Sequence, residues 1–277
     1  MHRFPHVLLL LTLLLVACGG TPAAPSSPAA AAASPTVGTK ITLNVFAAAS
    51  LTDAFKALVP AFEAAHPGVT VVYNFAGAQQ LAAQINEGAP ADVFASANRA
   101  QMDVVLASSK VISGTECIFV RNRLVVITPK TNPAGITSLK DLTKPGVKLI
   151  LAAKAVPVGQ YALDFLSKAS ALPEYSASYS PTVLANVVSY EDNVRSVLTK
   201  VALGEGDAGI VYPTDAATQA AAINTITIPD ELNVVAAYPI APLAGSKAPE
   251  LAQAFVAYVL SPEGQQVLVK FGFIAVK

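Results

Sequence analysis

The pattern that most constrains this chain is the alternation of short apolar segments with amphipathic segments from residue 41 onward. Residues 41–47 (ITLNVFA) and 69–75 (VTVVYNF) are rich in the β-branched and aromatic residues that favour strands. Between them, apolar residues recur at the spacing of one helix face, at Leu51, Phe55, Leu58, Val59 and Phe62. Strands that alternate with helices in this way predict a layered α/β fold.

The same alternation continues along the rest of the chain. Further strands are predicted within 88–96, 124–128, 148–152, 187–190, 209–212 and 233–240. Helices are predicted around Leu81 and Ile85 and over 160–168, 194–203 and 251–260. The segment from Ser50 to Asp53 has the pattern of a helix N-terminal cap, and His66-Pro67-Gly68 predicts the end of that helix.

The segment before residue 40 has a different character. Its apolar run, residues 7–17, is too short to span a membrane and predicts a signal peptide over 1–17. The run ends in Leu-Val-Ala-Cys-Gly, which resembles a bacterial lipobox, so Cys18 is predicted to carry lipid. An ordinary signal peptide with an incidental cysteine is the alternative. Residues 18–39 are rich in Pro, Ala, Ser and Gly and predict a disordered tether.

Charge excludes some classes of partner. The chain has 18 Lys+Arg and 18 Asp+Glu, and only 13% of its residues are charged, about half of the roughly 25% usual for soluble domains. Such a chain has no basic patch for nucleic acid and no polybasic segment for a membrane surface. We therefore expect no nucleic-acid partner.

Motifs of catalysis and metal binding are missing from the sequence. There is no G-x-S-x-G, no G-x-x-x-x-G-K-[ST] and no H-E-x-x-H. After the predicted signal peptide only His66 remains, in a predicted turn, so no zinc site is expected. A pair of catalytic carboxylates stays open as an alternative, although the spacing of Asp53, Asp92, Glu191 and Asp192 does not favour one.

Small or polar residues occupy the turns between predicted strands and helices. These turns are Ala48-Ala49-Ser50, Ala76-Gly77-Ala78, Pro157-Val158-Gly159 and Asn193-Val194. Ligands of open α/β sheets bind at the carboxyl ends of strands, and helix N-termini there suit anions. The turns therefore suggest an anion site, while ordinary capped turns are the alternative.

Five blocks carry a family resemblance over the whole body from residue 41. They are VFAAASLTDA (45–54), LxxQIxxGAPADVFASA (81–97), VPVGxYA (156–162), EDNVR (191–195) and GIVYxxDA (209–216). In this order they resemble the molybdate-binding proteins of ABC importers, which are type II periplasmic binding proteins. The resemblance implies an α/β, two-lobed flytrap fold with two crossover hinge strands. Lobe 1 would hold 41–122 plus 236–277, and lobe 2 would hold 123–235.

The resemblance also implies a set of oxyanion ligands. Ser50 would donate its hydroxyl and its backbone N–H, and Tyr212 its phenolic hydroxyl, while Ala78, Val158 and Val194 would offer backbone N–H groups. The family usually has a serine where this chain has Ala78, so one hydroxyl is lost, and the neighbouring Gln79 is the candidate to replace it. For each of these residues, plain packing or capping is the alternative. Arg195 is interpreted as structural, paired with a nearby carboxylate.

The function that the resemblance implies is capture of molybdate, and also tungstate, by a monomeric lipoprotein that passes the anion to the permease of an ABC importer. No cofactor is expected, and molybdenum would enter only as the bound oxyanion. Neutral donors suit a dianion because hydrogen bonds to a charged group are stronger than those between neutral groups. A binding protein for sulfate, phosphate, an amino acid or a ferric complex, or a hydrolase on the same fold, remains the alternative.

Overall fold

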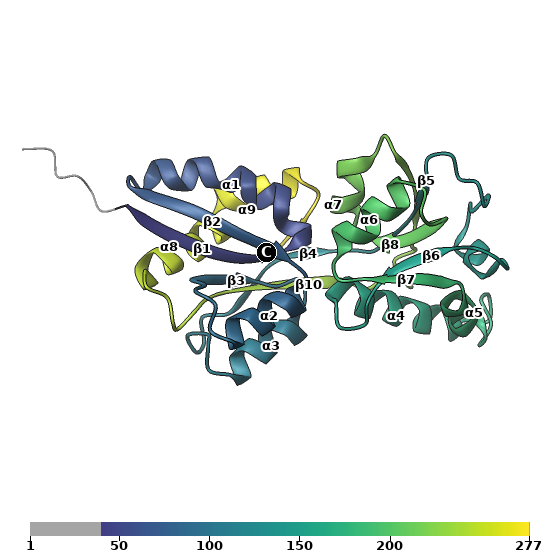
Figure 1. The fold of residues 1–277 in the computed structure, drawn as a ribbon, viewed down its shortest axis with the longest axis horizontal. Coiled ribbons are helices and arrows are strands. Elements are labelled where there is room, and N and C mark those ends of the chain that lie inside the picture. Colours follow the sequence, from purple (N-terminus) through teal and green to yellow (C-terminus); the bar gives the residue numbers. More distant parts are fainter. Residues whose placement is uncertain (1–39, 277) are drawn as a thin grey trace, which may run out of the picture. The chain divides into compact units, whose positions relative to one another are not determined.

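A computed structural model describes residues 40–276 of the chain, and its strands form two separate sheets (Figure 1). The six-stranded sheet has the order β11-β4-β10-β3-β1-β2, and the five-stranded sheet has the order β7-β6-β8-β5-β9. We call the six-stranded sheet with its helices the first lobe and the five-stranded sheet with its helices the second lobe.

The first lobe is built from both ends of the described segment. Its strands are β1 (Ile41–Ala48), β2 (Val69–Ala76), β3 (Val93–Ala95), β4 (Cys117–Asn122), β10 (Ala236–Pro242) and β11 (Ile274–Ala275). Its helices are η1 (Ala49–Leu51), α1 (Thr52–Ala65), α2 (Ala78–Asn86), α3 (Arg99–Ala107), α8 (Pro249–Leu260) and α9 (Pro262–Lys270). Strand β1 pairs in parallel with β2 and β3, whereas β10 runs antiparallel between β3 and β4.

The second lobe is continuous in sequence. Its strands are β5 (Val125–Pro129), β6 (Leu149–Ala152), β7 (Val187–Glu191), β8 (Ala208–Val211) and β9 (Ile223–Thr227). Its helices are η2 (Leu139–Thr143), α4 (Pro157–Ser170), α5 (Tyr179–Ala185), α6 (Val194–Ala202), α7 (Pro213–Ala216) and η3 (Ala217–Gln219). Here β6 pairs in parallel with β7 and β8, and β5 is antiparallel to β8 and β9.

The apolar residues that predicted the helix after the first strand do form its buried face. Phe55, Leu58 and Phe62 are almost inaccessible to solvent on α1, and the Phe62 ring meets the edge of Phe255 from α8 at 5.1 Å between centroids. Burying side chains of this size stabilises the fold by about 1.5–3 kcal/mol each. The core thus fixes the end of β1, where the chain turns toward α1.

Two short segments connect the lobes. The chain leaves the first sheet after β4 and enters the second at β5, and it returns between β9 and β10 (Figure 1). The buried Asn233 side chain ties the two segments together, because it accepts the Leu124 N–H at 2.9 Å and donates to the Leu124 carbonyl at 3.0 Å. Arg123 also pairs with Asp230 across them.

Most predicted elements are present, with some differences. The sequence patterns did not predict the strands β4, β9 and β11 or the helices α3, α5, α7 and α9, all of which are short. The strand predicted at 233–240 begins only at Ala236, because the preceding residues form the return segment. Ser50 does not cap α1: it lies inside η1, and α1 has no side-chain cap at its N-terminus.

Among residues 40–276, no helix is both long and apolar enough to cross a membrane. Nor does this part of the chain gather three or more His, Cys, Asp or Glu side chains that could hold a metal ion.

Candidate functional site

Five helix starts meet at one small cavity between the two lobes. Ser50 lies in η1 just ahead of α1, and Ala78 is the first residue of α2. From the second lobe, Val158 is the second residue of α4, Val194 is the first of α6, and Tyr212 directly precedes α7. All five residues line one small cavity. The structure therefore brings together every residue that the sequence suggested as an oxyanion ligand.

Several residues that line this cavity lie in the first turns of helices and carry backbone N–H groups. Such groups have no partner inside their own helix, because an α-helix bonds each N–H to the carbonyl four residues before it. Asn193 caps α6 by accepting the N–H of Ser196 at 3.0 Å, and this leaves the N–H of Val194 free of the cap. The N-terminal ends of helices also carry partial positive charge. The cavity thus combines unpaired donors with a favourable potential for an anion.

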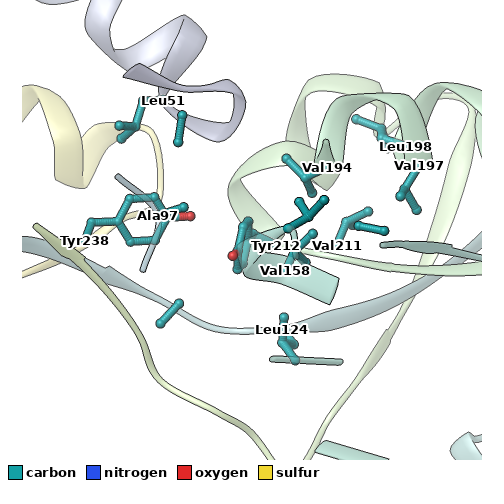
Figure 2. Packing of buried hydrophobic residues seen from close by; sticks show 14 of the residues in the cluster. Leu51, Ala97, Leu124, Val158, Val194, Val197, Leu198, Val211, Tyr212 and Tyr238 are labelled. Carbon is teal, nitrogen blue, oxygen red and sulfur yellow. The ribbon is translucent and has the colours of Figure 1, made fainter. Parts of the chain in front are cut away.

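Two hydroxyl groups complete the donor set, one from each lobe. Ser50 is 3% exposed, and its Oγ lies 3.0 Å from the hydroxyl of Tyr238. Tyr212 is 1% exposed, and its hydroxyl has no hydrogen-bond partner among the described residues. A buried hydroxyl without a hydrogen-bond partner destabilises the folded protein by about 1–3 kcal/mol. A ligand that accepts a hydrogen bond from Tyr212 would remove this penalty. Figure 2 shows Tyr212 beside Val158 and Val194, with Tyr238 and Ala97 across the gap.

The Tyr212 hydroxyl keeps its proton at any physiological pH. Burial raises the pKa of Tyr212 well above its ordinary value, and the nearby Tyr238 and Tyr161 raise the pKa further. Burial raises the pKa of Tyr238 in the same way. Both groups are therefore neutral O–H donors rather than phenolates, which would repel an anion.

No charged side chain lines the cavity. Its walls consist of small and apolar residues with Ser50, Asn193 and Tyr212 as the polar members: Ala48, Ala49, Ser50, Ala76, Gly77, Ala78, Ala97, Val156, Pro157, Val158, Asn193, Val194 and Tyr212. The cavity is much smaller than the roughly 300–1,000 Å³ typical of sites for drug-sized ligands. The site is thus built for a ligand of few atoms that accepts hydrogen bonds from every side.

Arg195 follows Val194 but does not reach into the cavity. Its Nε lies 2.5 Å from Asp215 of the second lobe, and its Nη2 lies 2.6 Å from Asp53 of the first lobe. Burial alone would lower the pKa of Arg195, but the two carboxylates outweigh this and raise the pKa. Burial raises the pKa of the fully buried Asp215 to about 6, although Arg195 acts in the opposite direction. The prediction that Arg195 pairs with a nearby carboxylate is confirmed.

Gln79 does not replace the missing serine hydroxyl. Its side-chain amide donates to the Asp192 carbonyl at 2.8 Å, so it joins the lobes at the rim and is not part of the cavity wall. Gly77 lies beside the same carbonyl, since a Cβ at position 77 would be 2.3 Å from the Asp192 oxygen. Gln101 donates to the Ala155 carbonyl at 3.2 Å, a further contact between the lobes. Through these contacts the two lobes touch each other at the edge of the cavity.

Sequence reasoning missed one residue next to the site. Tyr238 lies in β10 and contacts Ser50 from 188 positions away in the chain, and no local pattern distinguishes it from other tyrosines in strands. Only the folded arrangement reveals it. The predicted lipidation site, Cys18, lies outside the described residues.

Comparison with known proteins now assigns the family. Residues 43–274 match the family model of bacterial extracellular solute-binding proteins. The chain belongs to this family. Its relatives are binding proteins, so the chain is a binding protein and not an enzyme, and the predicted resemblance is confirmed.

Individual relatives add detail. The molybdate-binding protein ModA of Mycobacterium tuberculosis H37Rv is 39% identical over 241 residues, which are 87% of each chain. The structure of the periplasmic molybdate-binding protein of Azotobacter vinelandii matches 85% of this chain and all of that one, with a TM-score of 0.71 and 19% identity. The sulfate-binding protein SubI of M. tuberculosis H37Rv matches over 86% and 88% of the two chains, with a TM-score of 0.77 and 20% identity. Both structures confirm the two-lobed α/β fold.

Proposed function

We propose that this protein captures molybdate, and also tungstate, between its two lobes and delivers the anion to the permease of an ABC importer. The observation that carries the proposal is the buried Tyr212 hydroxyl, which has no partner among the described residues and lies within a ring of helix N-termini. A tetrahedral oxyanion supplies the acceptors that these donors lack. The relative at 39% identity is named a molybdate-binding protein, which favours molybdate over the other oxyanions.

Each proposed ligand has a defined role. Ser50 and Tyr212 donate hydroxyl protons from opposite lobes, so the anion joins the lobes when it binds. Ala78, Val158 and Val194 donate backbone N–H groups from the first turns of α2, α4 and α6. Charge-assisted hydrogen bonds of this kind are about twice as strong as neutral ones. Because the donors are fixed by the helices, little side-chain entropy is lost on binding.

Selectivity in this proposal depends on size. Molybdate, tungstate and sulfate are all tetrahedral dianions, so hydrogen-bond pattern and charge do not separate them. A rigid cavity holds one anion radius best, which separates sulfate from the larger pair. Molybdate and tungstate are nearly equal in size, so the site separates them poorly.

Lobe closure is the second part of the proposal. The lobes are expected to move as units whose boundaries lie near Asn122-Arg123 and near Val234-Ala236, where the chain passes between the sheets. Hinge closure around a ligand is a common mode of domain motion. The permease would recognise the closed form, and the protein would act as a monomer.

The membrane anchor is the third part. The lipobox-like sequence ending at Cys18 supports lipidation of that cysteine after removal of residues 1–17, with residues 18–39 as tether. Replacement of the cysteine, Cys18→Ser, is expected to release the protein from the membrane fraction of cells that express the full chain. Retention of the variant in that fraction would count against lipidation.

Calorimetric titration of residues 40–277 tests the binding proposal. Molybdate and tungstate are expected to bind with similar affinity, and sulfate and phosphate much more weakly. No heat with molybdate or tungstate at protein concentrations far above micromolar would overturn the proposal. Tight sulfate binding without molybdate binding would assign the site to the smaller anion instead.

A further inference from the structure

A buried tyrosine outside the cavity contacts one of the two proposed hydroxyl ligands. Tyr238 is fully buried in β10, and its hydroxyl lies 3.0 Å from Ser50 Oγ. It is not part of the cavity wall. We propose that Tyr238 is a positioning residue for anion binding, which donates its proton to Ser50 and thereby directs the Ser50 O–H toward the anion. This inference rests on the proposed function.

The direction of the hydrogen bond follows from the chemistry of the two groups. A serine hydroxyl has one proton and two lone pairs. If Ser50 gave its proton to Tyr238, its lone pairs would face the cavity and repel a dianion. If Tyr238 is the donor, the Ser50 proton is free for the anion. Because burial raises the pKa of Tyr238, this phenol keeps the proton that it must donate.

The surroundings of Tyr238 hold its hydroxyl in place. Its ring makes edge contacts with Phe119, Phe273 and Tyr212, at centroid distances of 6.4, 5.7 and 5.9 Å. A ring packed on three sides by aromatic edges cannot swing away from Ser50 without opening the core. The hydroxyl is therefore a fixed donor, and a chain of two hydrogen bonds polarises the Ser50 O–H further.

Tyr238 also lies where the lobes are joined. It is two residues beyond Ala236, where β10 begins after the return from the second lobe, and its ring contacts Tyr212 of that lobe. Figure 2 shows the side chains of Tyr238 and Tyr212 near each other, on segments of different lobes. Tyr238 thus contacts both proposed hydroxyl ligands, Ser50 through its hydroxyl and Tyr212 through its ring.

The variant Tyr238→Phe tests the proposal, because it removes only the hydroxyl. Calorimetry with molybdate is expected to give an affinity about 10-fold below that of the unmodified protein, in line with loss of one buried hydrogen bond. The matched control is Tyr73→Phe in the same lobe: Tyr73 donates to the Phe55 carbonyl at 2.9 Å and lies away from the cavity. This control is expected to leave the affinity unchanged, while its thermal stability falls as much as that of Tyr238→Phe.

A double-mutant cycle separates positioning from general stability. In a Ser50→Ala background, Tyr238→Phe is expected to change the molybdate affinity less than 2-fold, because the hydroxyl that it orients is gone. A full 10-fold loss in that background would overturn the proposal, as would wild-type affinity in the single Tyr238→Phe variant. Binding by the unmodified protein with no effect of Tyr238→Phe would leave the proposed function standing. No binding of any oxyanion by the unmodified protein would overturn both.

Replacement of Tyr238 by 3-fluorotyrosine is a second test that keeps the shape and the hydroxyl of the side chain. The fluorinated phenol is a stronger hydrogen-bond donor, so binding of molybdate is expected to be at least as tight as in the unmodified protein. A clear loss of affinity in a folded sample would contradict the donor role.

Discussion

The cavity and the cluster around Arg195 lie next to each other on the boundary between the lobes, yet they are built from opposite kinds of groups. The cavity has no charged side chain and collects hydroxyls and helix N-termini. The cluster, one residue beyond Val194, places a guanidinium between Asp53 and Asp215. The arginine nearest the site is therefore engaged by carboxylates of the protein and does not serve a ligand.

This difference explains how a charge-poor chain can bind a dianion. An arginine in the cavity would bind any anion strongly and would need its own desolvation to be offset. The hydroxyl and backbone N–H groups of the cavity are held in place and are largely shielded from water. They therefore favour an anion that fits their geometry. The ion pair between Arg195 and Asp53 instead joins the two lobes at the rim. Substitutions in the cavity and at the rim should therefore change molybdate affinity by different amounts.

The largest effect is expected from Ser50→Ala, which removes a cavity donor. Hydrogen bonds to charged groups contribute about 1.5–3 kcal/mol, so molybdate affinity should fall about 100-fold in calorimetry. Ser96→Ala is the matched control, since Ser96 is equally buried in the first lobe but donates to the Asn98 carbonyl and does not line the cavity. Equal affinities in Ser50→Ala and the unmodified protein would reject the assigned role of Ser50.

A somewhat smaller loss of molybdate affinity is expected from Gly77→Ala. Gly77 lines the cavity and also lies at the contact between the lobes. The added Cβ would lie 2.3 Å from the Asp192 carbonyl oxygen, so the lobes cannot close to the same distance. Overpacking costs about 1–3 kcal/mol, and we expect roughly 30-fold weaker molybdate binding. Gly245→Ala is the control, because nothing lies within 4 Å of the Cβ that it adds. If both variants bind alike, the lobe contact at Gly77 is not needed for binding.

Breaking the ion pair between the lobes should have only a modest effect. Asp53 is 41% exposed and Arg195 is 26% exposed, and pairs at such sites contribute up to about 1 kcal/mol. Asp53→Asn is therefore expected to weaken molybdate binding about 3-fold, and less at high salt. Asp103→Asn breaks the pair with Arg99 within a single helix and should leave affinity unchanged. A loss as large as that of Ser50→Ala would mean that charge at the rim dominates binding.

The smallest effect is expected from Ala78→Ser, which adds a hydroxyl to the cavity wall. Ala78 lines the cavity at the first position of α2, where the family resemblance implies a serine. The variant should bind molybdate as tightly as the unmodified protein or about 2-fold tighter. Loss of binding would mean that the side chain at position 78 points elsewhere than the cavity geometry implies.

The sequence predicted the fold well, and the residues that it suggested as ligands lie around one cavity, because both depend on local patterns. Strands such as β1 and β2 and the buried face of α1 follow from apolar spacing, and the turns that precede α2, α4 and α6 were visible as small residues after apolar runs. Contacts across the molecule could not be predicted in this way. The partner of Ser50 is 188 residues away, and Ser50 contacts the Tyr238 hydroxyl but makes no cap for α1.

Gln79 illustrates the same limit. Its position beside Ala78 suggested that it could replace the missing hydroxyl donor. The structure instead places the Asp192 carbonyl of the other lobe 2.8 Å from its side-chain amide, which the sequence alone does not reveal. Side-chain direction at a lobe boundary depends on how the lobes close, which is a property of the whole fold.

A structure of the protein crystallised with molybdate tests the central claim most directly. We expect the anion in the cavity, with its oxygens about 2.7–3.1 Å from the Ser50 and Tyr212 hydroxyls and from the N–H groups of Ala78, Val158 and Val194. Arg195 would remain paired with Asp53 and Asp215. An anion held by an arginine or lysine nitrogen, or bound outside this cavity, would contradict the account.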